Sequence, residues 1–252
     1  MRRHCRFGFT LLELSIVLVV LSLMMGGILA VLTQDSRISK KAELQMKMDA
    51  IEQAIIAYTK RSSTYALPCP ADPDLAITHA NFGVAVASGC ASLLYEDGDS
   101  AAGAVPVKTI GLPDEYAIDP WGNQFTYDVG LLAATTNALV TYPITSASLG
   151  VIIVRDFDDN PISSVAVMVL VSHGPNKFGA FGSNGIRRDV DSNNPAEQSN
   201  CNCESNGAYD THDSSYTTGI NTQDAGDEEN SFDDIVRYYE RSFFRLSGDL
   251  IL

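Results

Sequence analysis

The sequence has little positive charge, little histidine and a single tryptophan. Its 252 residues contain 17 lysines and arginines against 31 aspartates and glutamates, and the formal net charge is -14. A surface this acidic repels phosphate backbones and suits divalent cations better, so we expect no nucleic-acid partner. The four histidines show no metal-ligand spacing, and the sequence has neither a phosphate-binding glycine loop nor a nucleophile elbow. We therefore expect a protein that is not an enzyme.

A long apolar run lies near the N-terminus, from Phe9 to Leu32, and it carries one charge, Glu13. At about 1.5 Å per residue this run is long enough to cross the roughly 30 Å hydrocarbon core of a bilayer. The pattern predicts a transmembrane helix over residues 9–35. A carboxylate at mid-bilayer costs on the order of 2.5 to 3.5 kcal/mol, so Glu13 is expected to have a partner.

Two ordinary interpretations explain only part of this segment. A cleaved secretory signal has a shorter, uncharged apolar stretch, and Ile28-Leu29-Ala30 is a poor cleavage site. A plain signal anchor explains the length of the run but leaves Gly8, Phe9 and Glu13 unexplained.

A third interpretation accounts for all of these residues. The basic leader ending in Gly8, followed by Phe9-Thr10-Leu11-Leu12-Glu13, resembles the class III leader of type IV prepilins and type II secretion pseudopilins. The resemblance implies that prepilin peptidase cuts between Gly8 and Phe9, removes residues 1–8 and methylates the new amino group of Phe9. It also implies that Glu13 pairs with the terminal amine of a neighbouring subunit and sets the register of assembly. A glutamate that snorkels to the membrane interface is the alternative.

The same resemblance predicts where the protein acts and with what. It implies a single-pass inner-membrane protein with a periplasmic globular domain, residues 36–252. An inner-membrane assembly platform then extracts it into a filament of pilin or pseudopilin subunits, as in a type II secretion pseudopilus or a type IV pilus. Two alternatives stay open: a surface pilus adhesin that binds through residues 184–227, and a membrane-tethered periplasmic binding domain that keeps residues 1–8.

Beyond the membrane segment, the pattern predicts an α+β fold. Leu44, Met48, Ile51, Ile55 and Tyr58 alternate steps of four and three, which places them on one face of a helix. We expect one helix from Phe9 to Arg61, or two helices with a break near residues 33–39. The resemblance implies a type IV pilin-like fold, in which this helix packs on an antiparallel sheet.

Short apolar runs rich in β-branched residues predict the strands of that sheet. The candidate strands are residues 105–110, 125–129, 139–144, 151–155, 165–172 and 235–246. The run from Val165 to Val171 is apolar throughout, which predicts a strand covered on both faces.

Two further stretches extend the resemblance to the major pseudopilin of type II secretion. One is Asp119-Pro120-Trp121-Gly122-Asn123, and the other is Ser172-His173-Gly174-Pro175-Asn176 with the later segment from Asn230 to Ile235. In that protein the C-terminal loop binds calcium, which implies a possible calcium site here. The oxygen-bearing candidates are Asp224, Asp227, Glu228, Asn230, Asp233 and Asp234. The string from Asp189 to Asn193 is a second candidate, and the long polar insertion over residues 184–227 is a departure from the family pattern.

Cysteine is scarce, and Cys5 belongs to the predicted leader. The periplasm is oxidising, so disulfides are the expected state of the remaining four cysteines. We expect Cys69 to pair with Cys90. Cys201 and Cys203 either close a small ring or pair elsewhere.

Overall fold

The computed structural model is described over most of the chain, in two compact units, Met1–Glu43 and Leu44–Leu252. The described residues are 11–61, 65–87, 90, 93, 99–135, 139, 150–188, 194–201, 214–219 and 232–245, with side chains at all of these except 23–36 and 245.

Helix α1 (Leu11–Arg61) runs through both units without a break, so the alternative of two helices interrupted near residues 33–39 is wrong. In the second unit the side chains of Leu44, Met48, Ile51 and Ile55 are fully buried, and Tyr58 packs against the same core. The predicted apolar face of the helix is confirmed.

In the first unit, the described side chains of residues 11–22 are exposed. Most are large and apolar: Leu11, Leu12, Leu14, Ile16, Val17, Leu18, Val19, Val20 and Leu21. A continuous apolar surface of this kind marks a site for another protein or for a membrane. Where side chains are described, no helix has a stretch long and apolar enough to span a membrane. The predicted membrane segment, residues 9–35, lies partly outside them and stays a prediction.

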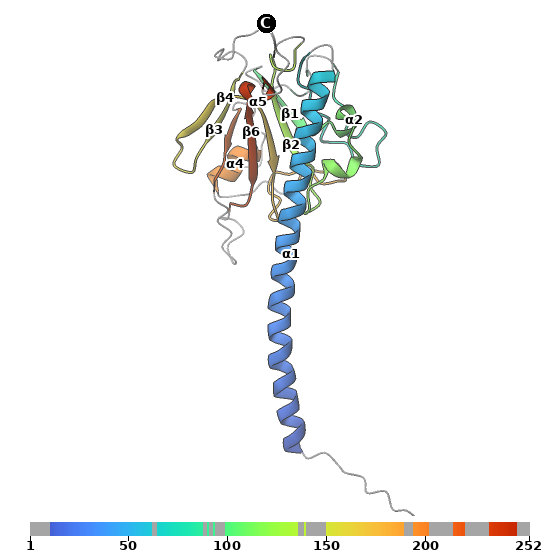
Figure 1. Cartoon of the computed structure of the whole chain (residues 1–252), viewed down its shortest axis with the longest axis vertical. Helices are drawn as coiled ribbons and strands as arrows, with labels where there is room; N and C mark the ends of the chain where they lie inside the picture. The colour runs from blue at the N-terminus through green and yellow to red at the C-terminus, as the bar shows by residue number, and fades with distance from the viewer. Residues whose placement is uncertain are drawn as a thin grey trace, which may run out of the picture. The chain divides into compact units, whose positions relative to one another are not determined.

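The second unit is built on a six-stranded sheet (Figure 1). Its strands are β1 (Ser100–Ala104), β2 (Thr126–Gly130), β3 (Ile152–Arg155), β4 (Pro161–Ser172), β5 (Ser215–Thr217) and β6 (Ile235–Glu240). Strand β4 pairs antiparallel with β2, β3 and β6, and β1 extends the sheet beyond β2. The predicted α+β class is confirmed. One pair, β3 with β5, is parallel rather than antiparallel, because β5 returns to the sheet only after a long crossover.

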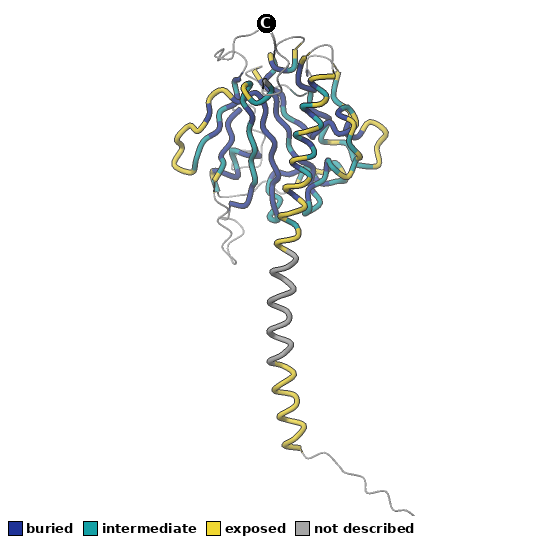
Figure 2. Tube along the Cα trace, viewed as in Figure 1, coloured by how far each residue is buried: buried dark blue, intermediate teal, exposed yellow. Residues whose placement is uncertain are grey.

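Strand β4 separates two apolar cores, and every residue from Ala166 to Ser172 is buried. In Figure 2 the middle of the sheet is drawn largely in the dark blue of buried residues. Met168 and Leu170 belong to the core that contains the apolar face of α1, and Val167 joins them where the pairing of β4 with β6 is irregular between Ala166 and Met168. Val169 and Val171 belong to a second cluster, which also contains Ile152, Val154, Ala166 and Tyr216. Side chains alternate across a strand, so a run of apolar residues serves both faces at once. Tyr216, which comes from the 184–227 insertion, helps to cover the second face.

Two strand predictions need correction. The expected strand at residues 105–110 is instead a short helix, α2 (Val107–Ile110), because Pro106 has no N–H for a sheet and Gly111 ends the helix at a φ of +86°. The strand there is β1, which ends at Ala104. The expected strand 235–246 ends at Glu240 and continues as helix α5 (Arg241–Arg245). The expected strand 139–144 lies outside the described residues except for Leu139.

The predicted strands near residues 125–129, 151–155 and 165–172 are confirmed as β2, β3 and β4. Two small helices complete the described elements: η1 (Asp114–Ala117) and α4 (Pro195–Cys201), which lies in the insertion.

The structure joins Cys69 and Cys90 in a disulfide, with their Cα atoms 5.3 Å apart. Cys201 is also disulfide-bonded, and Cys203 lies outside the described residues.

Candidate functional site

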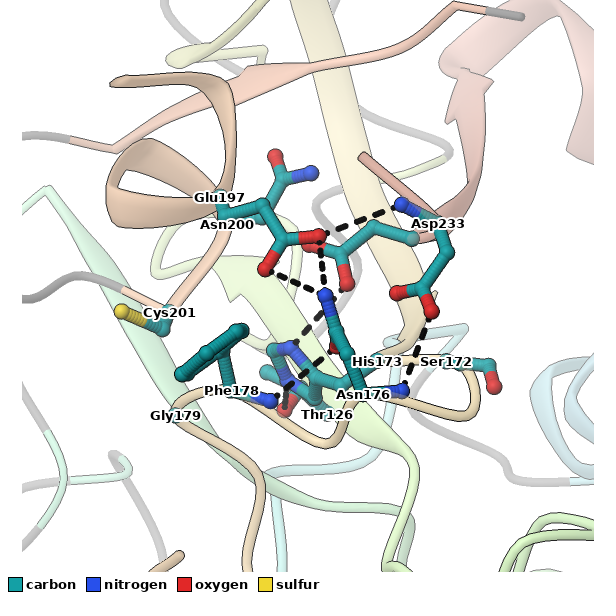
Figure 3. A network of polar contacts seen from close by, with 12 residues as sticks. Thr126, Ser172, His173, Asn176, Phe178, Gly179, Glu197, Asn200, Cys201 and Asp233 are labelled. Atoms are coloured by element: carbon teal, nitrogen blue, oxygen red, sulfur yellow. Dashed lines mark hydrogen bonds and ion pairs between the residues drawn. The ribbon is translucent and has the colours of Figure 1, made fainter. Parts of the chain in front are cut away.

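Three carboxylates meet in the interior beside the loop that follows β4. Glu197 comes from α4, and Asp233 and Asp234 come from the segment immediately before β6. One oxygen from each of the three carboxylates lies within 4.8 Å of the others, and the three residues are 1%, 0% and 3% exposed. Figure 3 shows Glu197 and Asp233 facing one another from these two segments. We call this group the carboxylate cluster.

Asn176, in the loop after β4, ties the segments of the cluster together. Its Nδ2 donates to Oε1 and Oε2 of Glu197 at 2.8 and 2.9 Å, and its backbone N–H donates to Oδ2 of Asp233 at 3.0 Å. The backbone N–H of Asp233 donates in turn to Oε1 of Glu197 at 3.1 Å. Three segments that are distant in sequence are thereby held at one point (Figure 3).

A glycine makes the close approach of two of these segments possible. Gly174 has a φ of +59°, and a Cβ atom there would lie 2.6 Å from the carbonyl oxygen of Asp233. A side chain at position 174 is therefore disfavoured for two reasons: the positive φ of the backbone and the lack of space for a Cβ atom. The loop after β4 can reach the segment before β6 because residue 174 is glycine.

A buried turn at residues 119–123 contacts the end of β4, where the loop begins. The carboxylate of Asp119 accepts the backbone N–H groups of Trp121 and Asn123 at 2.9 Å each, which closes the turn before β2. Its second oxygen accepts the hydroxyl of Ser172 at 2.9 Å. The turn at residues 119–123 and the loop that begins after Ser172 are thus in direct contact.

His173 lies next to the cluster but gives it no positive charge. Burial and then the charge of Arg187 lower the pKa of His173 to about 3, so the ring is neutral at pH 7. Its Nε2 shares a hydrogen bond of 2.9 Å with the hydroxyl of Thr126. Its Nδ1 is 3.7 Å from Oδ1 of Asp234, which is too long for a hydrogen bond.

The carboxylates are consequently in an unfavourable environment for negative charge. Burial, and then the charge of Asp233, raise the pKa of Glu197 to about 7 against the hydrogen bonds from Asn176. Burial and the charge of Glu197 also raise the pKa of Asp234 well above its usual range. The cluster therefore requires either protons or a cation.

The donor set fits a hard divalent cation. Neither carboxylate oxygen of Asp234 accepts a hydrogen bond within the described part of the chain, although the side chain is almost completely buried. Calcium takes oxygen ligands at about 2.3 to 2.6 Å, so two ligands on opposite sides of one ion lie about 5 Å apart. One oxygen from each of the three carboxylates lies within this limit of the others, so the three are close enough together to bind the same ion.

The predicted calcium ligands divide into two groups. Asp233 and Asp234 lie in the cluster, as described above. The other candidates lie outside the described residues: Asp224, Asp227, Glu228, Asn230 and the string 189–193.

Sequence reasoning missed Glu197. The order Asn194-Pro195-Ala196-Glu197 is a recognisable helix start, and Oδ1 of Asn194 does accept the N–H of Ala196 at 2.9 Å. This signal predicts the helix α4. It does not indicate that the glutamate is buried against residues that follow it by more than thirty positions.

The predicted processing and assembly residues belong to the N-terminal unit. Gly8 and Phe9 lie outside the described residues, and Glu13 lies in the first turn of α1 with an exposed side chain.

A family comparison identifies this N-terminal segment. Residues 3–29 match the prokaryotic N-terminal methylation motif, the prepilin signal of type IV pilins and pseudopilins. The predicted resemblance of this segment is confirmed, and the motif indicates a pilin-like substrate of prepilin peptidase. It also implies assembly among pilin-type subunits and a membrane-anchored state before incorporation into a filament. No curated protein and no solved structure matches the chain, and the type IV pilin-like fold of the second unit stays a prediction.

Proposed function

We propose that the protein is a structural subunit, a pseudopilin or minor pilin, of a type II secretion pseudopilus or a type IV pilus, and not an enzyme. The observation that carries the proposal is the methylation motif at residues 3–29, which includes the first part of the long helix α1. The exposed apolar surface over residues 11–22 supports it, because such a surface needs lipid before assembly and neighbouring helices after it.

In this function the protein acts mainly by packing against neighbouring subunits. Prepilin peptidase cuts between Gly8 and Phe9 and methylates Phe9, and the assembly platform in the inner membrane adds the processed subunit to the filament. The new positive terminus of one subunit pairs with Glu13 of a neighbour, so that two charges which are costly in an apolar setting neutralise each other. The periplasmic domain is carried outward on the α1 helix.

Calcium is the proposed cofactor of the globular domain. Glu197, Asp233 and Asp234 hold it, and its charge neutralises carboxylates that burial otherwise destabilises. Titration calorimetry on the calcium-free full chain in detergent tests this. We expect binding that Asp234→Asn abolishes and that Glu115→Gln, which changes an exposed carboxylate in η1, leaves intact.

The surface adhesin alternative assigns binding to the insertion 184–227. Its described elements, α4 and β5, are largely buried against the sheet, which favours a structural role for them. The tethered-domain alternative predicts that residues 1–8 are retained.

The mature N-terminus decides between the filament subunit and the tethered domain. We expect intact mass and peptide sequencing to find methylated Phe9 as the first residue when the cognate prepilin peptidase is present. The full chain should appear without the peptidase, and also in a Gly8→Val variant with it. A wild-type chain that keeps Met1 in the presence of the peptidase overturns the proposal.

A further inference from the structure

We propose that the cation of the carboxylate cluster clamps α4 and β5, two described elements of the 184–227 insertion, onto the sheet, so that cation binding controls whether these elements are docked. The inference rests on the proposed calcium site and concerns what that site does. The inference follows from the fact that the ligands come from two different segments. Glu197 belongs to the insertion, whereas Asp233 and Asp234 belong to the segment that leads into β6.

Within the insertion, α4 and β5 form one body. Nδ2 of Asn200 donates to the carbonyl of Thr217 at 2.9 Å, and the N–H of Thr217 donates back to Oδ1 of Asn200 at 2.7 Å. The hydroxyl of Ser199 donates to the carbonyl of Ser215 at 3.0 Å. Displacement of α4 therefore displaces β5 with it.

The contact of Glu197 with Asn176 and Asp233 joins this body to the loop after β4 and to the segment before β6. Without a cation, that same contact holds three carboxyl groups together in a medium of low dielectric, where ionised groups repel strongly unless they take up protons. The hydrogen bonds from Asn176 and Asp233 oppose the repulsion but supply no full positive charge. A divalent cation bound between the carboxylates attracts all three of them, so the net interaction of Glu197 with Asp233 and Asp234 becomes favourable.

Release of the body would uncover apolar surface. β5 covers the free edge of β3, and Tyr216 packs in the second core with Ile152, Val154, Val169 and Val171. Loss of β5 leaves an unpaired strand edge beside an apolar face, and both features favour association with other chains. The clamp therefore determines which surface the domain presents to its neighbours.

Hydrogen exchange with mass spectrometry on the full chain in detergent tests the clamp near neutral pH. With calcium in place of EDTA, we expect amide exchange in residues 195–201 and 215–217 to slow by about tenfold or more. Residues 44–55 of α1, whose buried side chains belong to the other apolar core, should change little. Glu197→Gln should remove the calcium dependence in the insertion, and Glu115→Gln should keep it.

Two results overturn the clamp in different ways. If calorimetry shows calcium binding but the exchange of the insertion is the same in calcium and EDTA, the calcium site stands and the clamp is wrong. If the wild-type chain binds no calcium, the calcium site and the clamp are both wrong. Processing at Gly8 still tests the filament function separately. Should Glu197→Gln fail to fold, the wild-type comparison between calcium and EDTA decides the question by itself.

Discussion

The hydroxyl of Ser172 donates a hydrogen bond to Oδ2 of Asp119 at 2.9 Å, and both residues are buried. Ser172 is the last residue of β4, and Asp119 begins the turn that leads into β2. This contact orients the loop that carries Asn176, which in turn binds Glu197 and Asp233. The carboxylate cluster is thus supported by a turn whose own residues do not enter it.

Ser172→Ala should lower the free energy of unfolding by about 1 to 3 kcal/mol, because it leaves one oxygen of the buried Asp119 without its donor. Urea unfolding measures the loss. Ser164→Ala is the matched control, since Ser164 is exposed on the same strand and should change stability by less than about 0.5 kcal/mol. Equal losses in the two variants would show that the contact contributes nothing specific.

Gly174→Ala should weaken both stability and calcium affinity. The added Cβ meets the carbonyl oxygen and carboxylate of Asp233 at 2.6 and 2.7 Å, so the loop and the segment before β6 must separate. Gly111→Ala separates this clash from backbone strain, because Gly111 also has a positive φ but has open space around it. Urea unfolding and calorimetry should show loss of stability in both variants, by about 1 to 2 kcal/mol for Gly111→Ala. Loss of calcium affinity is expected only in Gly174→Ala, and unchanged affinity there would contradict the described approach.

The stability of the calcium-free protein should fall as the pH rises from about 4.5 to about 7. Burial raises the pKa of Glu197 to about 7 in the folded protein, from 4.5 as its ordinary value. The folded state therefore binds protons more tightly than the unfolded chain in this window, and its advantage is lost as those protons leave. Calcium replaces them, so the gain in melting temperature from calcium should grow with pH. Melting curves in EDTA and in calcium between these pH values measure it, and a calcium gain that is constant with pH would exclude this role for the cluster.

The disulfide should contribute substantially to the stability of the globular domain. Cys69 and Cys90 are 21 positions apart, and closing a loop of this size is worth about 3 kcal/mol in the chain-entropy model. The double variant Cys69→Ser/Cys90→Ser should unfold at correspondingly lower urea concentration than the oxidised protein. Reduction of the wild-type protein should reproduce this loss, whereas the double variant should be insensitive to reductant.

Glu13→Gln should separate processing from assembly. The substitution leaves the Gly8–Phe9 bond unchanged, so we expect a normal mature N-terminus. Leaving one charge of a buried pair without its partner costs about 3 to 5 kcal/mol, so incorporation into sheared filaments should fall by at least about tenfold. Ser15→Ala, two residues along the same exposed helix, should assemble normally. Normal filament incorporation of Glu13→Gln would assign Glu13 to the membrane interface instead.

Local patterns in the sequence were sufficient for several elements of the structure. The steps of four and three from Leu44 to Ile55 predicted the buried face of α1, because periodicity depends only on near neighbours. The apolar run in β4 predicted burial on two faces for the same reason. Local propensity misled at residues 105–110, where β-branched residues suggested a strand and the two ends, Pro106 and Gly111, instead define a helical turn.

The sequence by itself determined the N-terminal processing signal and the amphipathic part of α1. Both features depend only on residues that are close together in the sequence. It also indicated Asp233 and Asp234 as candidate ligands through a resemblance. Only the tertiary structure brought Glu197 to them. Its burial depends on the long return of the insertion to β3, on the pairing of α4 with β5, and on the close approach at Gly174. These are contacts between distant segments, and no local pattern of charge or hydrophobicity encodes such contacts individually.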